Sequence, residues 1–390
     1  MTDSMPPQSM PDPAEPPDLP GPGRLAGRML LQLHPSRIRH FSAPLDLGRS
    51  GLVLTGDGAL VKAGELRAEG FSGALLVDEA RYTTAAATAE EPFPGLDEAP
   101  LQLFGDPLED MLQAQLVYAD AALAPTGYLH PEASGALKAA AKRIEGLKDP
   151  RVVFTVPIDV GWLRPDPVKQ LIAVLNEVPG SKALMLGGQM DPLGHFAGAV
   201  AGLVQVLSEV PQTALLRTDL AAFGALARGA AFSAFGADSS VRHIVPPAER
   251  AKTSGSGGPS TPHVLFPDLM AYFIGQKIAD EFAAADAPVC DCSVCDGAPL
   301  DRFTSMKQQV PAARHNAAVL MEWLHDMDAV QPADRPGWWQ QRCQHAVERY
   351  AFVNAQLDQP DFEPPEQLKR WAKFCGPSAP ATVPGGTPAP

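Results

Sequence analysis

Short apolar runs separated by helical segments are the feature of this sequence that most limits its fold. The runs do not alternate with polar residues, which is the pattern of strands buried on both faces of a parallel sheet. Seven runs follow one another from Ala74 onward, and His263–Phe266 is a candidate eighth. The predicted strands are Ala74–Val77, Ala121–Ala124, Val152–Pro157, Ala183–Leu186, Thr213–Leu216, Ala230–Phe235 and His243–Val245.

Two α/β architectures accommodate this pattern. Eight βα units close a TIM (β/α)8 barrel, which takes about 250 residues, and the chain has 390. A doubly wound open sheet is the alternative, but no Gly-x-Gly-x-x-Gly follows the first strand, as a dinucleotide-binding sheet would require. The barrel is therefore the favoured prediction.

Composition divides the chain into five segments. Residues 1–23 are rich in proline and residues 376–390 in proline, glycine, alanine and threonine, so both are expected to be disordered tails. Residues 24–73 read as an N-terminal strand layer and 74–284 as the barrel. Residues 285–375 read as a helical, zinc-binding subdomain. The last predicted helices are Leu269–Ala284, Val310–Met327, Gly337–Val353 and Pro365–Phe374.

Three cysteines lie within six residues, as Cys290-x-Cys292-x-x-Cys295. The intervening Asp and Ser make the segment polar, so core filling does not explain the thiols. This spacing lets three sulfurs converge on one Zn²⁺ at about 2.3 Å. His315 would complete a closed Cys₃His shell, which indicates a structural zinc ion rather than a catalytic one; His325 and His345 are alternative fourth ligands. A redox or incidental cysteine cluster is the other interpretation.

Charge and hydropathy restrict the possible partners. There are 31 basic and 45 acidic residues, giving a net charge of −14, which opposes non-specific attachment to nucleic acid. No apolar run approaches the ~20 residues of a transmembrane helix. The N-terminus lacks the apolar core of a secretory signal. We therefore expect no membrane association and a cytoplasmic protein, whose thiols stay reduced and available to a metal.

Several polar residues follow predicted strands, where a barrel places its catalytic groups. A carboxylate there could act as nucleophile, acid or base, or could cap the next helix. Capping is an equal alternative for Asp191 and Asp219, which directly precede helical segments. The candidates are Asp78, Glu79, Asp159, Gln189, Asp191, Arg217, Asp219, Asp238 and, less directly, His243.

The cysteine motif, placed after a βα barrel and followed by His315-Asn316, resembles the tRNA-guanine transglycosylase family. That resemblance covers residues 74 to about 327. It implies a TIM barrel with a C-terminal Cys₃His zinc subdomain. It also implies exchange of guanine for a 7-deazaguanine, as in queuosine formation, in tRNA or, for some relatives, DNA.

Other positions depart from the family pattern. Ala234 stands where the family has its nucleophilic Asp, and no Pro-Thr-Arg follows. Asp78-Glu79-Ala80 replaces the Asp-Ser-Gly turn that binds the base, and Gly187-Gly188-Gln189 matches the Gly-Gly substrate loop. The spacing from Cys295 to His315 is also shorter than usual.

Two functions remain open on these residues. In the first, a glycosyltransferase acts on nucleic acid or a nucleoside, with Asp238 or Asp159 as nucleophile. Asp78 and Gly187-Gly188-Gln189 would then contact a purine-like base. In the second, a non-catalytic subunit or binding protein keeps the barrel and the zinc but has lost base exchange, as the missing nucleophile favours. A tRNA or DNA partner and a dimer fit either function.

Overall fold

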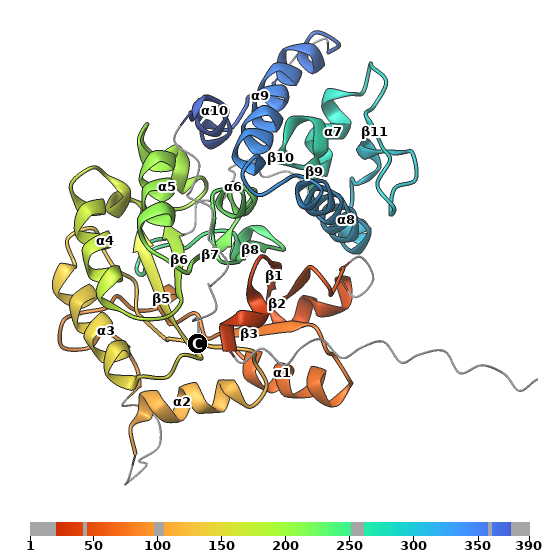
Figure 1. Cartoon of the computed structure of the whole chain (residues 1–390). Coiled ribbons are helices and arrows are strands. Elements are labelled where there is room, and N and C mark those ends of the chain that lie inside the picture. The colour runs from red at the N-terminus through yellow and green to blue at the C-terminus, as the bar shows by residue number, and fades with distance from the viewer. Residues whose placement is uncertain (1–20, 42–44, 97–104, 251–260, 358–360, 376–390) are drawn as a thin grey trace, which may run out of the picture.

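Eight parallel strands form one sheet that curls into a nearly closed barrel, with helices between successive strands (Figure 1). This computed structural model describes residues 21–41, 45–96, 105–250, 261–357 and 361–375. The strand order is β3-β2-β1-β8-β7-β6-β5-β4, so the α/β barrel prediction is confirmed. The strands are β1 (Met29–Leu33), β2 (Ser50–Thr55), β3 (Ala74–Asp78), β4 (Ala122–Leu123), β5 (Val152–Asp159), β6 (Lys182–Gly187), β7 (Thr213–Thr218) and β8 (Ser233–Gly236).

The predicted starting point of the barrel was wrong. β1 and β2 are barrel strands and not a separate N-terminal layer, because β1 pairs in parallel with both β2 and β8. The predicted strand His243–Val245 contributes only an isolated bridge between Ile244 and Gly187. The candidate eighth strand, β9 (His263–Phe266), pairs antiparallel with β10 (Ala271–Ile274) outside the barrel.

Helices surround the barrel and shield the outer face of its strands. Each helix from α1 to α6 links one strand to the next from β2 to β8. In the described part of the connection between β1 and β2 the helical element is a 3₁₀ helix, η2 (Pro35–His40). The six helices are α1 (Ala59–Ala68), α2 (Pro107–Leu116), α3 (Ser134–Leu147), α4 (Pro167–Glu177), α5 (Ala199–Glu209) and α6 (Ala221–Ala227).

The apolar core consists of two clusters, and the smaller one fills the inside of the barrel. Its members come from alternate positions of the strands, because successive side chains of a strand point to opposite faces. Leu30, Leu76, Met185 and Leu216 belong to it and are fully buried. The inside of the barrel is therefore packed with side chains, as is usual for eight strands.

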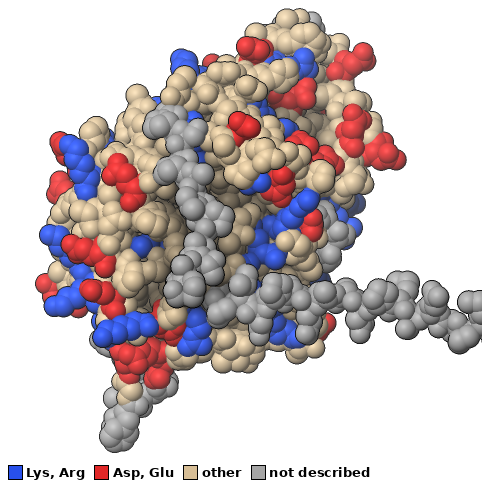
Figure 2. Space-filling view, viewed as in Figure 1, with Lys and Arg blue, Asp and Glu red and all other residues tan. Residues whose placement is uncertain are grey.

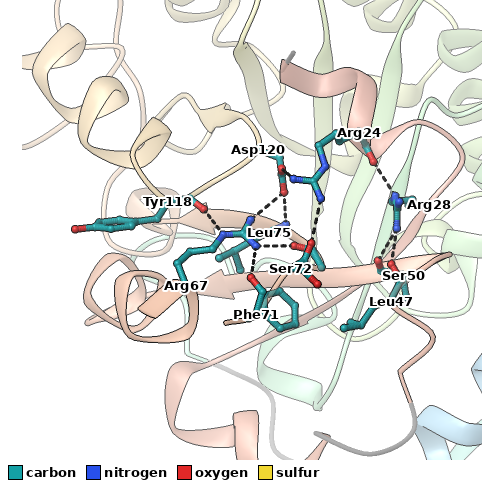
Figure 3. Close-up of polar contacts among 11 residues, drawn as sticks. Arg24, Arg28, Leu47, Ser50, Arg67, Phe71, Ser72, Leu75, Tyr118 and Asp120 are labelled. Atoms are coloured by element: carbon teal, nitrogen blue, oxygen red, sulfur yellow. Dashed lines mark hydrogen bonds and ion pairs between the residues drawn. The ribbon is translucent and has the colours of Figure 1, made fainter. Parts of the chain in front are cut away.

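Asp120 joins the two edges of the sheet, next to the start of β4 (Figure 3). Its backbone N–H donates to the Leu75 carbonyl of β3 (2.9 Å), and its carboxylate accepts from the Leu75 N–H (2.7 Å). The same carboxylate pairs with Arg24 (2.7 Å) and Arg67 (3.2 Å). Its side chain is only 5% exposed. Asp120 thus closes the seam between β3 and β4 with both backbone and side chain.

The chain after the barrel packs beside α6 and β8 and is mostly helical (Figure 1). The predicted helix Leu269–Ala284 is wrong in its first part, because residues 271–274 pair with β9. The α-helices and strands described after β10 are α7 (Gly275–Glu281), β11 (Val289–Cys290), β12 (Ala298–Pro299), α8 (Gln309–Asp328), α9 (Arg335–Asn354) and α10 (Glu366–Lys373). The predicted disordered tails lie outside the described residues, apart from 21–23. Among the described helices none combines the length and the apolarity needed to cross a bilayer.

Candidate functional site

The structure brings the three motif cysteines and His315 together. All four side chains are buried, and their ligand atoms lie within 4.8 Å of one another. The Nδ1 atom of His315 is 3.5 Å from the sulfurs of Cys290 and Cys292 and 3.2 Å from that of Cys295. A tight turn makes this possible: Gly297 takes a φ of +78° and its N–H donates to the Cys290 carbonyl. The cluster is consistent with a metal site.

Hydrogen bonds from neighbouring groups orient His315 and stabilise a negative charge on Cys295, as cation binding requires. Nε2 of His315 contacts the Leu265 carbonyl at 2.8 Å; the carbonyl can only accept, so Nε2 carries the proton and Nδ1 presents its lone pair to the sulfurs. The guanidinium of Arg302 donates to the Cys295 sulfur at 2.9 Å. Hydrogen bonds from Cys290 and Cys292, together with Arg302, lower the pKa of Cys295 and so favour its thiolate form.

The two alternative histidines lie elsewhere. His325 contacts Arg49 through Nδ1 at 2.6 Å, and His345 is exposed on α9. Asn316, the neighbour of His315, is buried and holds β9 against α8. Its side chain accepts from the Leu265 N–H (2.7 Å) and donates to the His263 carbonyl (2.9 Å).

Asp78 lies at the end of β3, at the barrel mouth, and is 3% exposed. Its carboxylate accepts hydrogen bonds from Tyr82 (2.5 Å), Gln32 (2.9 Å) and the Ala80 N–H (2.9 Å). Burial raises its pKa, and the nearby Arg217 acts in the opposite direction. The predicted base contact is thus already saturated by hydrogen bonds from the protein.

Arg217 extends this buried network across the mouth. Its Nη1 contacts the Tyr82 hydroxyl at 3.3 Å, and its backbone N–H donates to the side-chain oxygen of Gln32 at 2.7 Å. The residue has a φ of +49° at an irregularity in the register of β7 and β8. Such a backbone costs of order 1–3 kcal/mol for a residue other than glycine, so the network holds Arg217 in a conformation it would not adopt alone.

The two proposed nucleophiles are held in different ways. Asp159, at the end of β5, accepts from the Tyr128 hydroxyl (2.9 Å) and from the Gly161 N–H (2.7 Å). Burial and the Asp159 charge raise the pKa of Tyr128. Asp238 follows β8 and caps a 3₁₀ helix, where its Oδ1 accepts from the Ser240 N–H at 3.0 Å. Both carboxylates therefore have structural roles in this state of the protein.

Asp191 and Asp219 also cap short helical turns, as one of the two interpretations predicted. Asp191 accepts from the Gly194 N–H (2.9 Å) and Asp219 from the Ala221 N–H (2.9 Å). Both also accept from Gln367 of α10, Asp191 from its backbone N–H and Asp219 from its side chain. Burial and the Asp219 charge raise the pKa of Asp191 to about 6. The two carboxylates thus fasten α10 to the barrel.

We expect Asp191→Asn to change how stability depends on pH. A carboxyl whose pKa is higher in the folded than in the unfolded chain makes the fold less stable as the pH rises from the unfolded-state pKa to the folded-state pKa, here about 6. The wild type should therefore lose up to about 3 kcal/mol relative to the variant between pH 4 and pH 6.5. Urea unfolding of both proteins across this range measures the difference; parallel curves would contradict the assignment.

Three arginines lie near one another on the rim of the mouth. Arg37 and Arg39 are on η2, directly after β1, and Arg314 is on α8. All three lower the pKa of His40, after the larger effect of its burial. Within the described ranges none of the three forms a salt bridge. Figure 2 shows basic side chains gathered between α8 and β1.

Sequence reasoning missed most of the mouth network. Gln32, Thr55 and Tyr82 occupy it, yet only their position near strand ends could have indicated a role. No sequence pattern indicates a role for Gln367, because it lies 176 residues from Asp191, the residue that it contacts. Gly187, Gly188 and Gln189 do follow β6, and the Gln189 amide donates to Glu249 at 2.6 Å. No protein-family model matches this chain, and no curated protein sequence matches it.

Proposed function

We propose that this protein is a cytoplasmic, zinc-bound barrel of the tRNA-guanine transglycosylase type that binds nucleic acid at its rim without exchanging a base. Ala234 carries the proposal. It lies in β8 next to Leu30 of β1, fully buried in the barrel interior. Its methyl group has no nucleophilic atom, and base exchange requires a carboxylate that attacks the sugar.

Zinc is the metal that best fits the cysteine cluster. Three thiolates and one imidazole are a common structural zinc shell, and tetrahedral bonds of about 2.3 Å to sulfur and 2.0 Å to nitrogen place these atoms roughly 3.5 Å apart. The separations of 3.2 to 3.5 Å between His315 Nδ1 and the sulfurs agree with this. Four protein ligands leave no position for a reacting water, so the ion would stabilise the fold.

The rim arginines support a polyanionic partner. Arg37, Arg39 and Arg314 are cations without a salt bridge in the described chain, and the Nε of Arg314 is buried without a hydrogen-bond partner. A net charge of −14 disfavours general attraction to nucleic acid, so binding would depend on this local group. Contacts with phosphates place a nucleic acid without reading its sequence.

A residual exchange activity is the second candidate, and Asp238 favours it. It follows β8, the strand on which the family carries its nucleophile, and it is half-buried at the mouth. Only its Oδ1 accepts hydrogen bonds among the described residues. Its Oδ2 would be the attacking atom, with Asp78 near the base.

Incorporation of radiolabelled guanine into tRNA or DNA separates the two candidates. We expect no incorporation by zinc-replete protein, because alanine replaces the nucleophile. Incorporation that disappears in Asp238→Asn would establish the second candidate and overturn the first. Incorporation that survives this substitution would refute both the proposal of a non-catalytic protein and the assignment of Asp238 as the nucleophile.

Nucleic-acid binding can be tested independently of exchange. We expect the double variant Arg37→Gln, Arg39→Gln to bind fluorescein-labelled tRNA at least about tenfold more weakly than the wild type. The slope of log K against log salt concentration should also become smaller in magnitude by about one for each lost phosphate contact. Lys138→Gln, an exposed cation on α3, is the matched control. Equal affinity of the double variant and the control would contradict a role for the rim.

A further inference from the structure

A cavity of about 590 Å³ lies between the barrel mouth and the C-terminal helices. One wall is formed by the segments that follow β6, β7 and β8, and the opposite wall by β10, α9 and α10. This volume falls in the usual range for small-molecule sites, which are often found between two packed parts of a protein. Neither Asp78 nor Asp159 lines the cavity, so it is separate from the centre of the mouth.

Arg242 is the charged group that distinguishes this cavity. It is 6% exposed, and its Nε donates to the Gly236 carbonyl at 3.2 Å. It forms no ion pair and no other hydrogen bond within the described residues. A buried cation without a counter-charge is costly, and a guanidinium keeps its terminal nitrogens as a flat pair of donors. These nitrogens are available to an oxyanion.

Two local features hold Arg242 in this position. Gly236 lets the chain return over the end of β8, because a Cβ there would lie 2.4 Å from the Val241 carbonyl oxygen. The guanidinium carbon then stacks 3.4 Å from the ring centre of Tyr272 on β10. The geometry is therefore preorganised by the barrel on one side and by the C-terminal part on the other.

The remaining lining favours a flat, mostly apolar ligand with a few polar atoms. Tyr272, Trp339 and Trp371 supply aromatic surface. The Nδ1 of His243 and the Nε1 of Trp371 are buried and have no hydrogen-bond partner in the described part of the chain. Asp191 and Asp219 lie at the α10 side, where Gln367 engages both.

We propose that this cavity binds a small molecule with a planar aromatic body and one oxyanion, a carboxylate or a phosphate monoester, which pairs with Arg242. The body lies against Tyr272 and the tryptophans of α9 and α10, and no chemical step is involved. The site is independent of nucleic-acid binding at the rim, so either proposal can fail without the other.

Isothermal titration calorimetry with four simple probes tests the ligand class. Phenyl phosphate and phenylacetate carry an aromatic ring and an oxyanion, and whichever binds more tightly identifies the preferred anion. Inorganic phosphate lacks the ring, and phenethylamine replaces the anion by a cation. We expect both phenyl anions to bind at least tenfold more tightly than the other two probes, as loss of a charge-assisted hydrogen bond implies. Absence of binding by both anions at millimolar concentration, or equal binding of phenethylamine, would overturn the proposal.

Two substitutions locate the binding in the cavity. Arg242→Gln removes the cation and should weaken phenyl anion binding about tenfold or more. Ser239→Trp places a bulky side chain at an exposed position of the cavity lining, without touching the stack of Arg242 on Tyr272. It should weaken the binding of the phenyl anions to a similar degree while the protein stays folded. The control Lys138→Gln removes an exposed cation on α3 and should change the affinity for the phenyl anions less than about twofold. Unchanged affinity in Ser239→Trp and Arg242→Gln would refute the site.

Discussion

Replacing Cys292 by alanine is expected to release the metal and to unfold the part of the chain around α8. The four candidate ligands come from two separate segments, and bonds to a shared metal would hold these segments together. Structural zinc contributes about 10–16 kcal/mol in small zinc-binding peptides, so three remaining ligands should not retain it. Metal analysis should give one zinc per wild-type chain and none in the variant. Hydrogen exchange should show lost protection in α8 and β9.

The matched control is Cys375→Ala, which removes an exposed thiol outside the cluster. This variant should keep the metal and the thermal stability of the wild type. A wild-type protein without stoichiometric zinc, purified under reducing conditions, would contradict both the metal assignment and the resemblance built on it.

Replacing Asp120 by alanine is expected to destabilise the whole barrel by about 3–5 kcal/mol, the cost of breaking a buried ion pair from one side. The change leaves Arg24 and Arg67 without their carboxylate and removes the acceptor for the Leu75 N–H. These contacts lie between β3 and β4, the two edge strands of the sheet. Chemical denaturation measures the loss.

Asp149→Ala provides the comparison for Asp120. Asp149 also pairs with an arginine, Arg151, at 2.7 Å, but this pair is more exposed and joins neighbouring residues. Surface pairs contribute about 0–1 kcal/mol, so this variant should remain close to wild type. A similar loss of unfolding free energy in both variants would show that the contact between β3 and β4 does not depend on Asp120.

The sequence predicted the cysteine cluster and most barrel strands because both depend on local pattern. The spacing of Cys290, Cys292 and Cys295 fixes their convergence whatever the rest of the chain does. Fully apolar runs identify strands buried on both faces, and six of those predicted belong to the barrel. The same pattern failed for β9, since an apolar run does not reveal whether its partner is parallel or antiparallel.

The roles of the mouth residues could not be predicted, because they depend on contacts between distant segments. Asp78 was a candidate for a base contact because it follows a strand and because the resemblance places it in the base-binding turn. Its saturation by Gln32 and Tyr82 follows from the pairing of β1, β2 and β3, which places their ends together. The burial of Arg242 depends on the packing of Tyr272 from β10 against it, and no local sequence pattern indicates that contact.

The hydrogen bonds around Leu265 link the metal cluster to the cavity. Its carbonyl accepts from His315 and its N–H donates to Asn316. In the sheet, Leu265 lies opposite Tyr272, the ring on which Arg242 stacks. A metal bound at the cluster would therefore fix the position of Tyr272 under Arg242 through one residue of β9. Occupancy of the cation site and affinity for an anion should rise and fall together, so that chelator-treated protein binds phenyl phosphate more weakly than the zinc-loaded form.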